Sequence, residues 1–318
     1  MKTAIIYGPR DIRVEEAETP GVGPDDVLVQ VRACGICGSD VHRYLGTDYG
    51  RYSKYPMNSG HEYCGDIAEV GSRVAKFRRG DKVTLGISWG DGKLGAFSEY
   101  VRIADADARL CRVPEEISYV NGALIETLLV AMNSYHRPDP KPDEHILILG
   151  SGTIGLCVLL LCRAKGLQNI TVSEPSAKRR ALATEYGIET VDPTTEDLAE
   201  IVMGATRGQG ADVSFDCAGE GAATNQAFAL TRRGGRISLI SHYRTAPRIN
   251  VETLIMKSMN VFGPDYGHAL YDEAVELILE GKVDLTPLVS HVYPLTRAGE
   301  AFETAANVNE SVKALLNP

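Results

Sequence analysis

The chain contains no apolar run close to the roughly 20 residues that a membrane-spanning helix needs. Charges at Arg10, Asp11 and Arg13 interrupt its beginning before any apolar stretch reaches the length of a signal peptide. Positive charge is also scarce: the formal net charge is -9, and nucleic-acid binders need a basic face to release counterions. The sequence therefore predicts a cytoplasmic protein with no membrane anchor and no nucleic-acid partner.

Cysteines are few, and their pattern argues against a disulfide framework. The chain has 7, an odd number, and no secretory signal, which favours reduced thiols and a metal site. Cys34 and Cys37 form a CxxC pair, for which a redox role or half of a four-cysteine structural site is the competing interpretation. No second CxxC completes such a site, and the pair does not open a helix after a thioredoxin-like strand. Five other cysteines are interpreted as small core residues: Cys64, Cys111, Cys157, Cys162 and Cys217.

A length of 318 residues exceeds what one hydrophobic core usually holds, so two domains with a cleft between them are expected. The first third reads as short strands separated by turns (DVLVQVRAC, CGDIAEVGSRV, DKVTLGI, GAFSEYVRI) and predicts a small antiparallel β domain. From about residue 145, strand-like runs alternate with helical stretches, which predicts βαβ units in a parallel sheet. The tail, with the amphipathic helix YDEAVELILEGKV and the strand HVYP, is expected to rejoin the first domain. The predicted domains are residues 1–127 with 265–318, and residues 128–264.

A nucleotide-binding motif follows the first of these strand-like runs. In ILILGSGTIG, Gly150, Gly152 and Gly155 form GxGxxG at the start of a helix, where the backbone can approach a pyrophosphate. Glu174 ends the next strand, where its carboxylate can bind the ribose hydroxyls and repel a 2′-phosphate. This favours NAD over NADP, although three basic residues nearby can also hold a 2′-phosphate: Lys178, Arg179 and Arg180. A glycine turn without a ligand is the alternative.

A second group of residues has the composition of a metal site. CGICGSDVH, residues 34–42, and GHEYCG, which contains His61 and Glu62, bring a thiol, imidazoles and carboxylates into two short segments. Zinc accepts mixed sulfur, nitrogen and oxygen ligands, and a catalytic zinc site uses three protein ligands with one open position. The sequence therefore predicts a catalytic zinc site.

Together these motifs resemble a known family. GICGSDVH, GHEYCGDIAEVG, FRRGDKV, GAFSEYV, GALIETLLV and LGSGTIG occur in the order found in zinc-containing medium-chain alcohol dehydrogenases, and the similarity extends over nearly the whole chain. The chain looks most like the polyol and sorbitol dehydrogenase branch, with which the L-threonine 3-dehydrogenases share a key glutamate. The resemblance implies an α/β fold, with a doubly wound Rossmann sheet and a GroES-like antiparallel β-barrel that carries the catalytic site.

The resemblance also implies roles for individual residues at the metal. Cys37 and His61 would be zinc ligands, and Glu62 a ligand or an exchange partner, with a buried structural carboxylate as the alternative. Glu126, in GALIE, would bind zinc directly or through its water. Asp40 would orient His61 through its other ring nitrogen, which would fix the tautomer of the ring.

The implied chemistry is transfer of a hydride to the cofactor with loss of a proton. Zinc would polarise the substrate oxygen, Ser39 would accept the proton, and the cofactor ribose and His42 would pass it to solvent. Ser39, His42 and Glu62 are therefore the catalytic candidates. For His42 a surface position without a role is the alternative. The residues expected to contact the cofactor are Gly150, Ser151, Gly152, Thr153, Ile154, Gly155, Glu174, Arg179, Cys217 and Ile240.

The expected activity is oxidation of a CH–OH group in a polyol or sugar-like substrate by a dehydrogenase that uses NAD, or less favourably NADP. The alternatives are oxidation of L-threonine at C3, a zinc-free quinone or enone reductase, and a non-catalytic NAD-binding protein on the same fold. The expected partner is a small hydroxylated molecule. A homodimer or homotetramer is also expected, with GGRISLISH as the edge strand at the interface.

Two departures from the family pattern qualify this expectation. The four cysteines of a structural zinc are absent after the GDKV strand, so one zinc per chain is expected. NVFGPDYG stands where the polyol branch has an arginine–aromatic pair.

The segment 43–56 either lines the substrate entrance through Tyr49, Arg51 and Lys54, which would suit even a phosphorylated substrate, or is a solvated loop. Trp89 either flanks the cleft or covers the shortened lobe.

Overall fold

The computed structural model describes residues 1–47, 53–85, 95–243, 245–264 and 266–318. These residues form two compact units. Unit 1 comprises Met1–Leu129, His268–Asn307 and Ser311–Pro318, and unit 2 comprises Val130–Gly267 and Val308–Glu310. The domain boundaries expected from the sequence lie close to these divisions.

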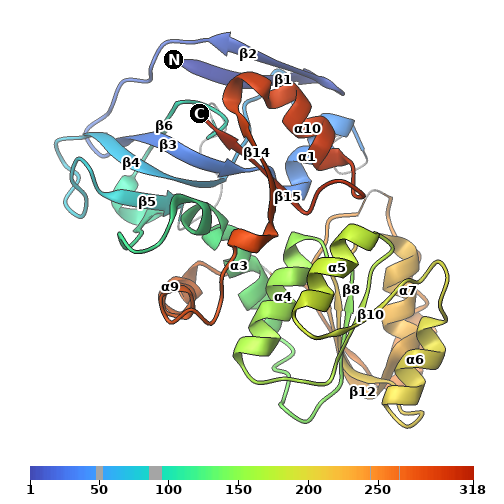
Figure 1. Ribbon diagram of the computed structural model, residues 1–318. Coiled ribbons are helices and arrows are strands. Elements are labelled where there is room, and N and C mark those ends of the chain that lie inside the picture. The colour runs from blue at the N-terminus through green and yellow to red at the C-terminus, as the bar shows by residue number, and fades with distance from the viewer. Residues whose placement is uncertain (48–52, 86–94, 244, 265) are drawn as a thin grey trace. The chain divides into compact units, whose positions relative to one another are not determined.

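Unit 1 contains a seven-stranded sheet, within the described residues, in the order β14-β15-β3-β4-β5-β7, and β6 also pairs with β3. Its strands are β3 (Val27–Gly35), β4 (Glu62–Val70), β5 (Lys82–Leu85), β6 (Tyr100–Ile103), β7 (Leu110–Arg112), β14 (Val289–Pro294) and β15 (Lys313–Asn317). A separate antiparallel pair is formed by β1 (Lys2–Gly8) and β2 (Asp11–Glu16). The pairing is antiparallel as the sequence predicts, except that β14 and β15 run parallel. Figure 1 shows β15, in red, beside β3, in blue, although they are far apart in the sequence.

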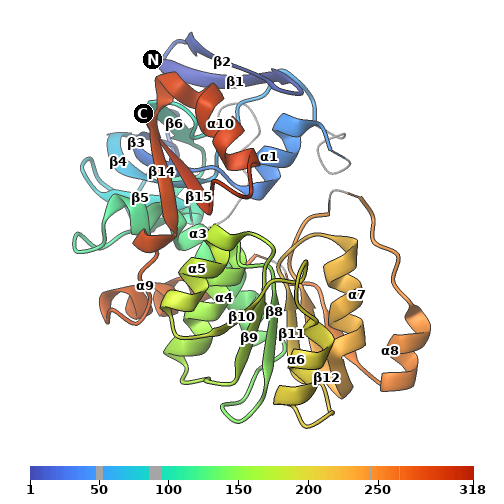
Figure 2. The ribbon, with the colours of Figure 1, turned by 45° about the vertical axis from the view of Figure 1, so that its right-hand side comes forward.

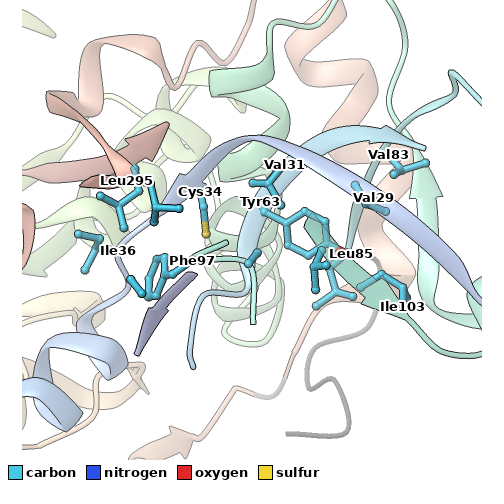
Figure 3. Packing of buried hydrophobic residues seen from close by; sticks show 14 of the residues in the cluster. Val29, Val31, Cys34, Ile36, Tyr63, Val83, Leu85, Phe97, Ile103 and Leu295 are labelled. Carbon is cyan, nitrogen blue, oxygen red and sulfur yellow. The ribbon is translucent and has the colours of Figure 1, made fainter. Parts of the chain in front are cut away.

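The core of unit 1 is built from the inward-facing residues of these strands. Val29 and Val31 of β3, Tyr63 of β4 and Leu85 of β5 are all buried in one cluster. Figure 3 shows them packed together with Phe97. Alternation along β3 and β4 places apolar side chains on this inner face, which gives the sheet its main stabilisation through burial.

The helices of unit 1 are mostly short. They are α1 (Gly38–Leu45), α2 (Ala106–Arg109), α9 (Tyr271–Leu279) and α10 (Ala298–Ala306), with 3₁₀ turns η2 (His268–Leu270), η3 (Thr286–Leu288) and η4 (Leu295–Arg297). The longer α3 (Tyr119–His136) crosses from unit 1 into unit 2. Cys37 caps the start of α1, where the carboxylate of Asp40 accepts a hydrogen bond from the Cys37 backbone N–H, and Gly46 caps its end with φ 66°. Tyr44 of α1 packs on Phe302 of α10 with ring centroids 5.2 Å apart.

Unit 2 is a doubly wound parallel sheet in the order β10-β9-β8-β11-β12-β13. Its strands are β8 (Ile146–Leu149), β9 (Ile170–Ser173), β10 (Glu189–Val191), β11 (Ala211–Asp216), β12 (Thr231–Leu239) and β13 (Asn260–Phe262). Its helices are α4 (Thr153–Ala164), α5 (Ala177–Glu185), α6 (Leu198–Ala205), α7 (Gly221–Leu230) and α8 (Val251–Lys257). Figure 2 shows α4 and α5 on one side of the strands and α7 and α8 on the other. This is the Rossmann arrangement that the βαβ spacing predicts.

One expectation about this sheet is wrong. The GGRISLISH segment does not form an edge strand, because β12 is hydrogen-bonded to β11 on one side and to β13 on the other. The short run MNVF adds one further strand after α8, so that β13 occupies the edge.

All seven cysteines are free, and Cys64, Cys157 and Cys162 are buried as expected. Cys111 and Cys217 are only half-buried, since both lie near the ends of strands and not within the core. No helix in the described parts of the chain is long and apolar enough to cross a lipid bilayer.

Candidate active site

A thiol, an imidazole and a carboxylate meet at the start of α1 and β4. Cys37 caps α1, His61 precedes β4 and Glu62 is its first residue. One ligand atom from each lies within 4.8 Å of the others. Because β3 and β4 pair antiparallel, with Gly35 opposite Glu62, the turn into α1 brings Cys37 to these two residues.

The electrostatics of this cluster suit a cation. Burial opposes the charged form of His61, but Cys37, followed by Asp40 and Glu126, raises its pKa well above the usual value. The acidic groups that favour a proton on His61 also favour a metal ion, because either positive charge relieves the repulsion among the thiolate and the carboxylates. Mixed sulfur, nitrogen and oxygen donors are those that zinc accepts, so the residues present fit zinc.

Glu62 is held by a lysine that the sequence analysis did not identify. Lys313 of β15 places its Nζ 2.9 Å from Oε1 and 2.6 Å from Oε2 of Glu62, and both side chains are buried. Lys313 also donates to the Ile36 carbonyl at 3.1 Å. Although burial raises the pKa of Glu62, the Lys313 ammonium lowers it overall, so Glu62 is ionised. The available sequence signal was a lysine within the buried strand KALL.

Glu126 supplies a second buried carboxylate from α3. Burial raises its pKa to about 7, Glu62 and Asp40 add to this rise, and His61 and Lys313 oppose it. Its side chain is therefore close to the point of gaining or losing a proton at neutral pH. A carboxylate in this condition can become a metal ligand when a cation arrives.

Asp40 lies behind the cluster and is fully buried. Its Oδ2 accepts from the Cys37 backbone N–H at 3.1 Å and lies 4.0 Å from Nδ1 of His61, too long for a hydrogen bond. Its Oδ1 accepts from Arg43 Nη1 at 3.2 Å and from the Ser59 hydroxyl. Asp40 therefore acts on His61 through charge in this structure. Neither Arg43 nor Ser59 was found by sequence reasoning.

The two candidates for proton transfer both lie on α1. Ser39, in its first turn, is buried, and its Oγ accepts from Arg43 Nη1 at 3.1 Å. His42 is half-buried, and its Nδ1 lies 2.8 Å from Thr47 Oγ1. Thr47 therefore engages Nδ1, one of the two ring nitrogens through which a histidine can exchange a proton.

The glycine turn of unit 2 has the geometry that a dinucleotide requires. Gly150 has φ 89°, and a Cβ on Gly155 would lie 1.9 Å from the Gly150 carbonyl oxygen, so both positions need glycine. Glu174 accepts from the backbone N–H of Ser151 at 2.8 Å and of Ser176 at 2.9 Å. The carboxylate at the end of β9 is thus fixed beside the turn that follows β8.

Two buried hydroxyls next to this carboxylate have no hydrogen-bond partner among the residues that the structure describes: Ser151 Oγ and Ser176 Oγ. Orphaned buried hydroxyls cost free energy unless a ligand satisfies them, so they fit a bound nucleotide. Burial lowers the pKa of Arg179, and its Nη1 lies 3.5 Å from where a Cβ of Gly152 would be. Arg180 is engaged elsewhere, with Asp192.

The remaining cofactor candidates lie at the same edge of the sheet. Thr153 and Ile154 begin α4, Cys217 follows β11, and Ile240 follows β12. These positions follow the carboxyl ends of β8, β11 and β12, and Glu174 follows β9 on the other side of β8. In doubly wound sheets this edge, where the strand order reverses, is where nucleotides bind.

Several residues that the sequence singled out belong neither to the metal cluster nor to the cofactor-binding edge. Tyr49, Arg51 and Trp89 fall outside the described residues. Lys54 is exposed. Cys34, the other half of the CxxC pair, lies with Tyr63 in the core cluster of Figure 3, and burial raises the pKa of its thiol. A buried, protonated thiol in a strand does not support a redox role for that pair.

A zinc-type donor set in one unit and a dinucleotide-binding sheet in the other are the two parts of a metal-dependent dehydrogenase. Family models agree: the alcohol dehydrogenase GroES-like domain matches residues 23–115, and the zinc-binding dehydrogenase domain matches residues 153–280.

Individual proteins match over nearly their full length. Sorbitol dehydrogenase of Bacillus subtilis (strain 168) is 30% identical over 100% of this chain and 97% of its own. L-Idonate 5-dehydrogenase of Vitis vinifera is 30% identical over 99% of this chain and 94% of its own. A structure described as a zinc-binding dehydrogenase from Sinorhizobium meliloti 1021 bound to NADP has a TM-score of 0.89 and 28% identity, covering 100% of this chain and 99% of that one.

The chain therefore belongs to the zinc-dependent medium-chain alcohol dehydrogenases, in the branch that contains the sorbitol dehydrogenases. It is an oxidoreductase that acts on CH–OH groups and uses zinc and a nicotinamide cofactor.

Proposed function

We propose that the protein oxidises a secondary alcohol of a polyol or sugar-like substrate with NAD, using one zinc ion per chain. The observation that carries this proposal is the cluster of Cys37, His61 and Glu62 in a unit whose relatives include enzymes named for sorbitol and L-idonate. In this proposal unit 1 is the catalytic domain and unit 2 the cofactor domain.

The preference for NAD rests on Glu174. Its carboxylate is buried beside the glycine turn, where it can accept hydrogen bonds from ribose hydroxyls and would repel a 2′-phosphate. Of the three basic residues that favour NADP, Arg180 pairs with Asp192 and Lys178 donates to the Glu310 carbonyl. Only Arg179 is directed at the turn.

Bound zinc would polarise the substrate oxygen, and the nicotinamide would take the hydride. Cys37 and His61 would hold the metal, and either Glu62 or Glu126 would complete the donor set. Ser39 would accept the substrate proton, and His42 would return it to solvent. Lys313 keeps Glu62 ionised in either case.

The test combines metal analysis with turnover. We expect about one zinc per purified chain, and NAD reduction with at least one substrate in a panel of polyols, sugar acids, phosphorylated polyols and L-threonine. Cys37→Ser should lower the zinc content and reduce turnover by roughly 1,000-fold or more. Cys111→Ser, at a half-buried thiol of β7, is the matched control and should retain both.

The same assay resolves the open choices. Turnover with L-threonine alone would replace the polyol proposal, and an active, zinc-free Cys37→Ser protein would refute the metal mechanism. A higher kcat/KM with NADP than with NAD would refute the role given to Glu174. Zinc affinity measured for Glu62→Gln and Glu126→Gln identifies the carboxylate that binds the metal.

We also propose that the protein self-associates and works in the cytoplasm. Several apolar side chains of the β13 edge and the adjoining α8 region are exposed: Ile249, Val251, Ile255, Met256 and Val261. An open strand edge next to an exposed apolar surface supports pairing with a second copy. The seven free thiols suit a reducing compartment.

A further inference from the structure

Arg43 contacts the proposed proton relay directly. It lies one turn after Ser39 on α1, and its side chain is only 11% exposed. A single atom, Nη1, donates to Ser39 Oγ at 3.1 Å and to Asp40 Oδ1 at 3.2 Å. The backbone at Arg43 is itself tied down, because the Tyr55 hydroxyl donates to its carbonyl at 2.5 Å.

The hydrogen bond from Arg43 restricts the other hydrogen bonds that the Ser39 hydroxyl can make. A hydroxyl has one donor and two acceptor sites, and a guanidinium can only donate. Arg43 therefore occupies one acceptor site of Ser39 Oγ. One acceptor site and the Ser39 hydrogen remain, and the hydrogen must point away from Arg43.

Asp40, the nearest carboxylate in sequence, does not compete for that hydrogen. Its Oδ1 already accepts from Arg43 and Ser59, and its Oδ2 accepts from the Cys37 backbone N–H. These three hydrogen bonds occupy most of the acceptor sites of the carboxylate, and within the described residues Ser39 donates none to it. Arg43 thus fixes Ser39 and fills one acceptor site of Asp40 with the same atom.

We propose that Arg43 is a positioning residue that sets the direction of proton transfer through Ser39. The inference rests on the proposed relay. The substrate hydroxyl would give its proton to the free acceptor site of Ser39 Oγ, while Ser39 would pass its own proton to His42, which would return it to solvent. Ser39 would end the step uncharged and Arg43 would keep all its protons, and a bound nicotinamide cofactor would supply the hydride acceptor.

The test compares Arg43→Met and Arg43→Gln with Arg43→Lys. Removal of the guanidinium should lower kcat by about 10- to 100-fold with little change in KM, because binding is retained and orientation is lost. The solvent deuterium isotope effect on kcat should rise, because proton transfer becomes slower. Arg43→Lys, which can still donate to the serine, should recover part of kcat.

Two controls separate this role from a structural one. Zinc content, and the cobalt-to-thiolate absorption of the cobalt-substituted protein, should match the wild type in every Arg43 variant. Arg10→Met removes an exposed ion pair with Glu303 next to the same helix and should leave kcat and the isotope effect unchanged.

The possible outcomes distinguish a failure of the role given to Arg43 from a failure of the relay itself. If Arg43→Met, or Arg43→Gln should the former not fold, has wild-type kcat and isotope effect while Ser39→Ala is impaired, Arg43 has no positioning role and the relay stands. If Ser39→Ala itself keeps wild-type kcat, the relay fails and the inference falls with it, while turnover of the wild type leaves the enzyme activity untouched.

Discussion

At the scale of single residues, the buried pair of Glu62 and Lys313 is the most consequential contact of the site. Neither charge reaches water, and each is stabilised by the other. Removing one partner of such a pair leaves an uncompensated buried charge, which costs about 3–5 kcal/mol. The metal site therefore depends on a residue that does not bind the metal.

We expect Lys313→Met to destabilise the protein by about 3–5 kcal/mol, because Glu62 is left buried without a counter-charge. Urea unfolding followed by tryptophan fluorescence and circular dichroism measures the loss.

The double variant with Glu62→Gln is the control for Lys313→Met. It should lose less than the sum of the two single changes, since the pair is removed as a unit. Additive losses would mean that the two residues do not act as a pair.

The sequence predicted the residues whose chemistry is local. Cys37 and His61 stand in short motifs, and the structure brings them together with Glu62. Lys313 lies 251 positions from Glu62, and only the pairing of β15 with β3 joins them. Arg43 was missed for a different reason, since an arginine on a short helix is ordinarily a solvated side chain.

At the scale of elements, the contact between α4 and the turn after β8 holds the cofactor motif in place. Gly155→Ala should separate the helix from the turn, because its Cβ would lie 1.9 Å from the Gly150 carbonyl oxygen. We expect a loss of about 1–3 kcal/mol in stability and a weaker affinity for NAD. Thermal unfolding and calorimetric titration with NAD measure the two effects.

Gly204→Ala provides the matched control for this change. Gly204 lies in α6, where a Cβ would meet no atom within 4 Å. The substitution should be neutral or stabilise by about 0.4–1 kcal/mol, and NAD affinity should stay the same. Equal behaviour of the two variants would contradict a special role for Gly155.

His145, just before β8, should make unit 2 sensitive to acid. Burial lowers the pKa of His145, although Asp212 and Glu189 oppose this. The neutral ring therefore stabilises the folded state fully above the unfolded pKa of about 6.5, and this contribution is lost as the pH falls through the lower folded pKa.

We expect the melting temperature of the wild type to fall more between about pH 7.5 and pH 5.5 than that of His145→Gln. The control is His136→Gln, which makes the same substitution at an exposed histidine on α3. A wild type and His145→Gln with the same pH dependence would contradict the assignment.

The elements themselves were largely predictable. Alternating or continuous apolar runs identified β3, β4 and the strands of the parallel sheet, because burial on one or both faces leaves that pattern. Strand pairing was harder to predict from the sequence, because the parallel pairing of β14 with β15 and the edge position of β13 depend on where distant segments pack.

At the scale of the whole molecule, the exposed surface of α8 should govern association. Ile255 is 66% exposed and Met256 61%. Ile255→Asp should weaken or abolish self-association, since a charge in an apolar interface loses its hydration on binding. Analytical ultracentrifugation compares it with Val292→Asp on β14, where Val292 is also exposed.

The control should associate as the wild type does. A monomeric wild type, or an Ile255→Asp variant that associates normally, would contradict the proposed interface.

Length and the change in strand pattern near residue 145 predicted two domains and a discontinuous first one. The α/β class and the doubly wound sheet followed from the βαβ spacing. What the sequence alone did not reveal is how the tail enters unit 1, since β15 lies inside the sheet, between β14 and β3.

The inserted position of β15 has a consequence for how the protein is made. Apart from Val308–Glu310, unit 2 is one segment, Val130–Gly267, which can fold while it leaves the ribosome. The sheet of unit 1 must wait for residues 313–317, which arrive after the rest of that sheet has been synthesised. Until then Glu62 has no lysine beside it, so a competent zinc site would form only after translation has passed β15.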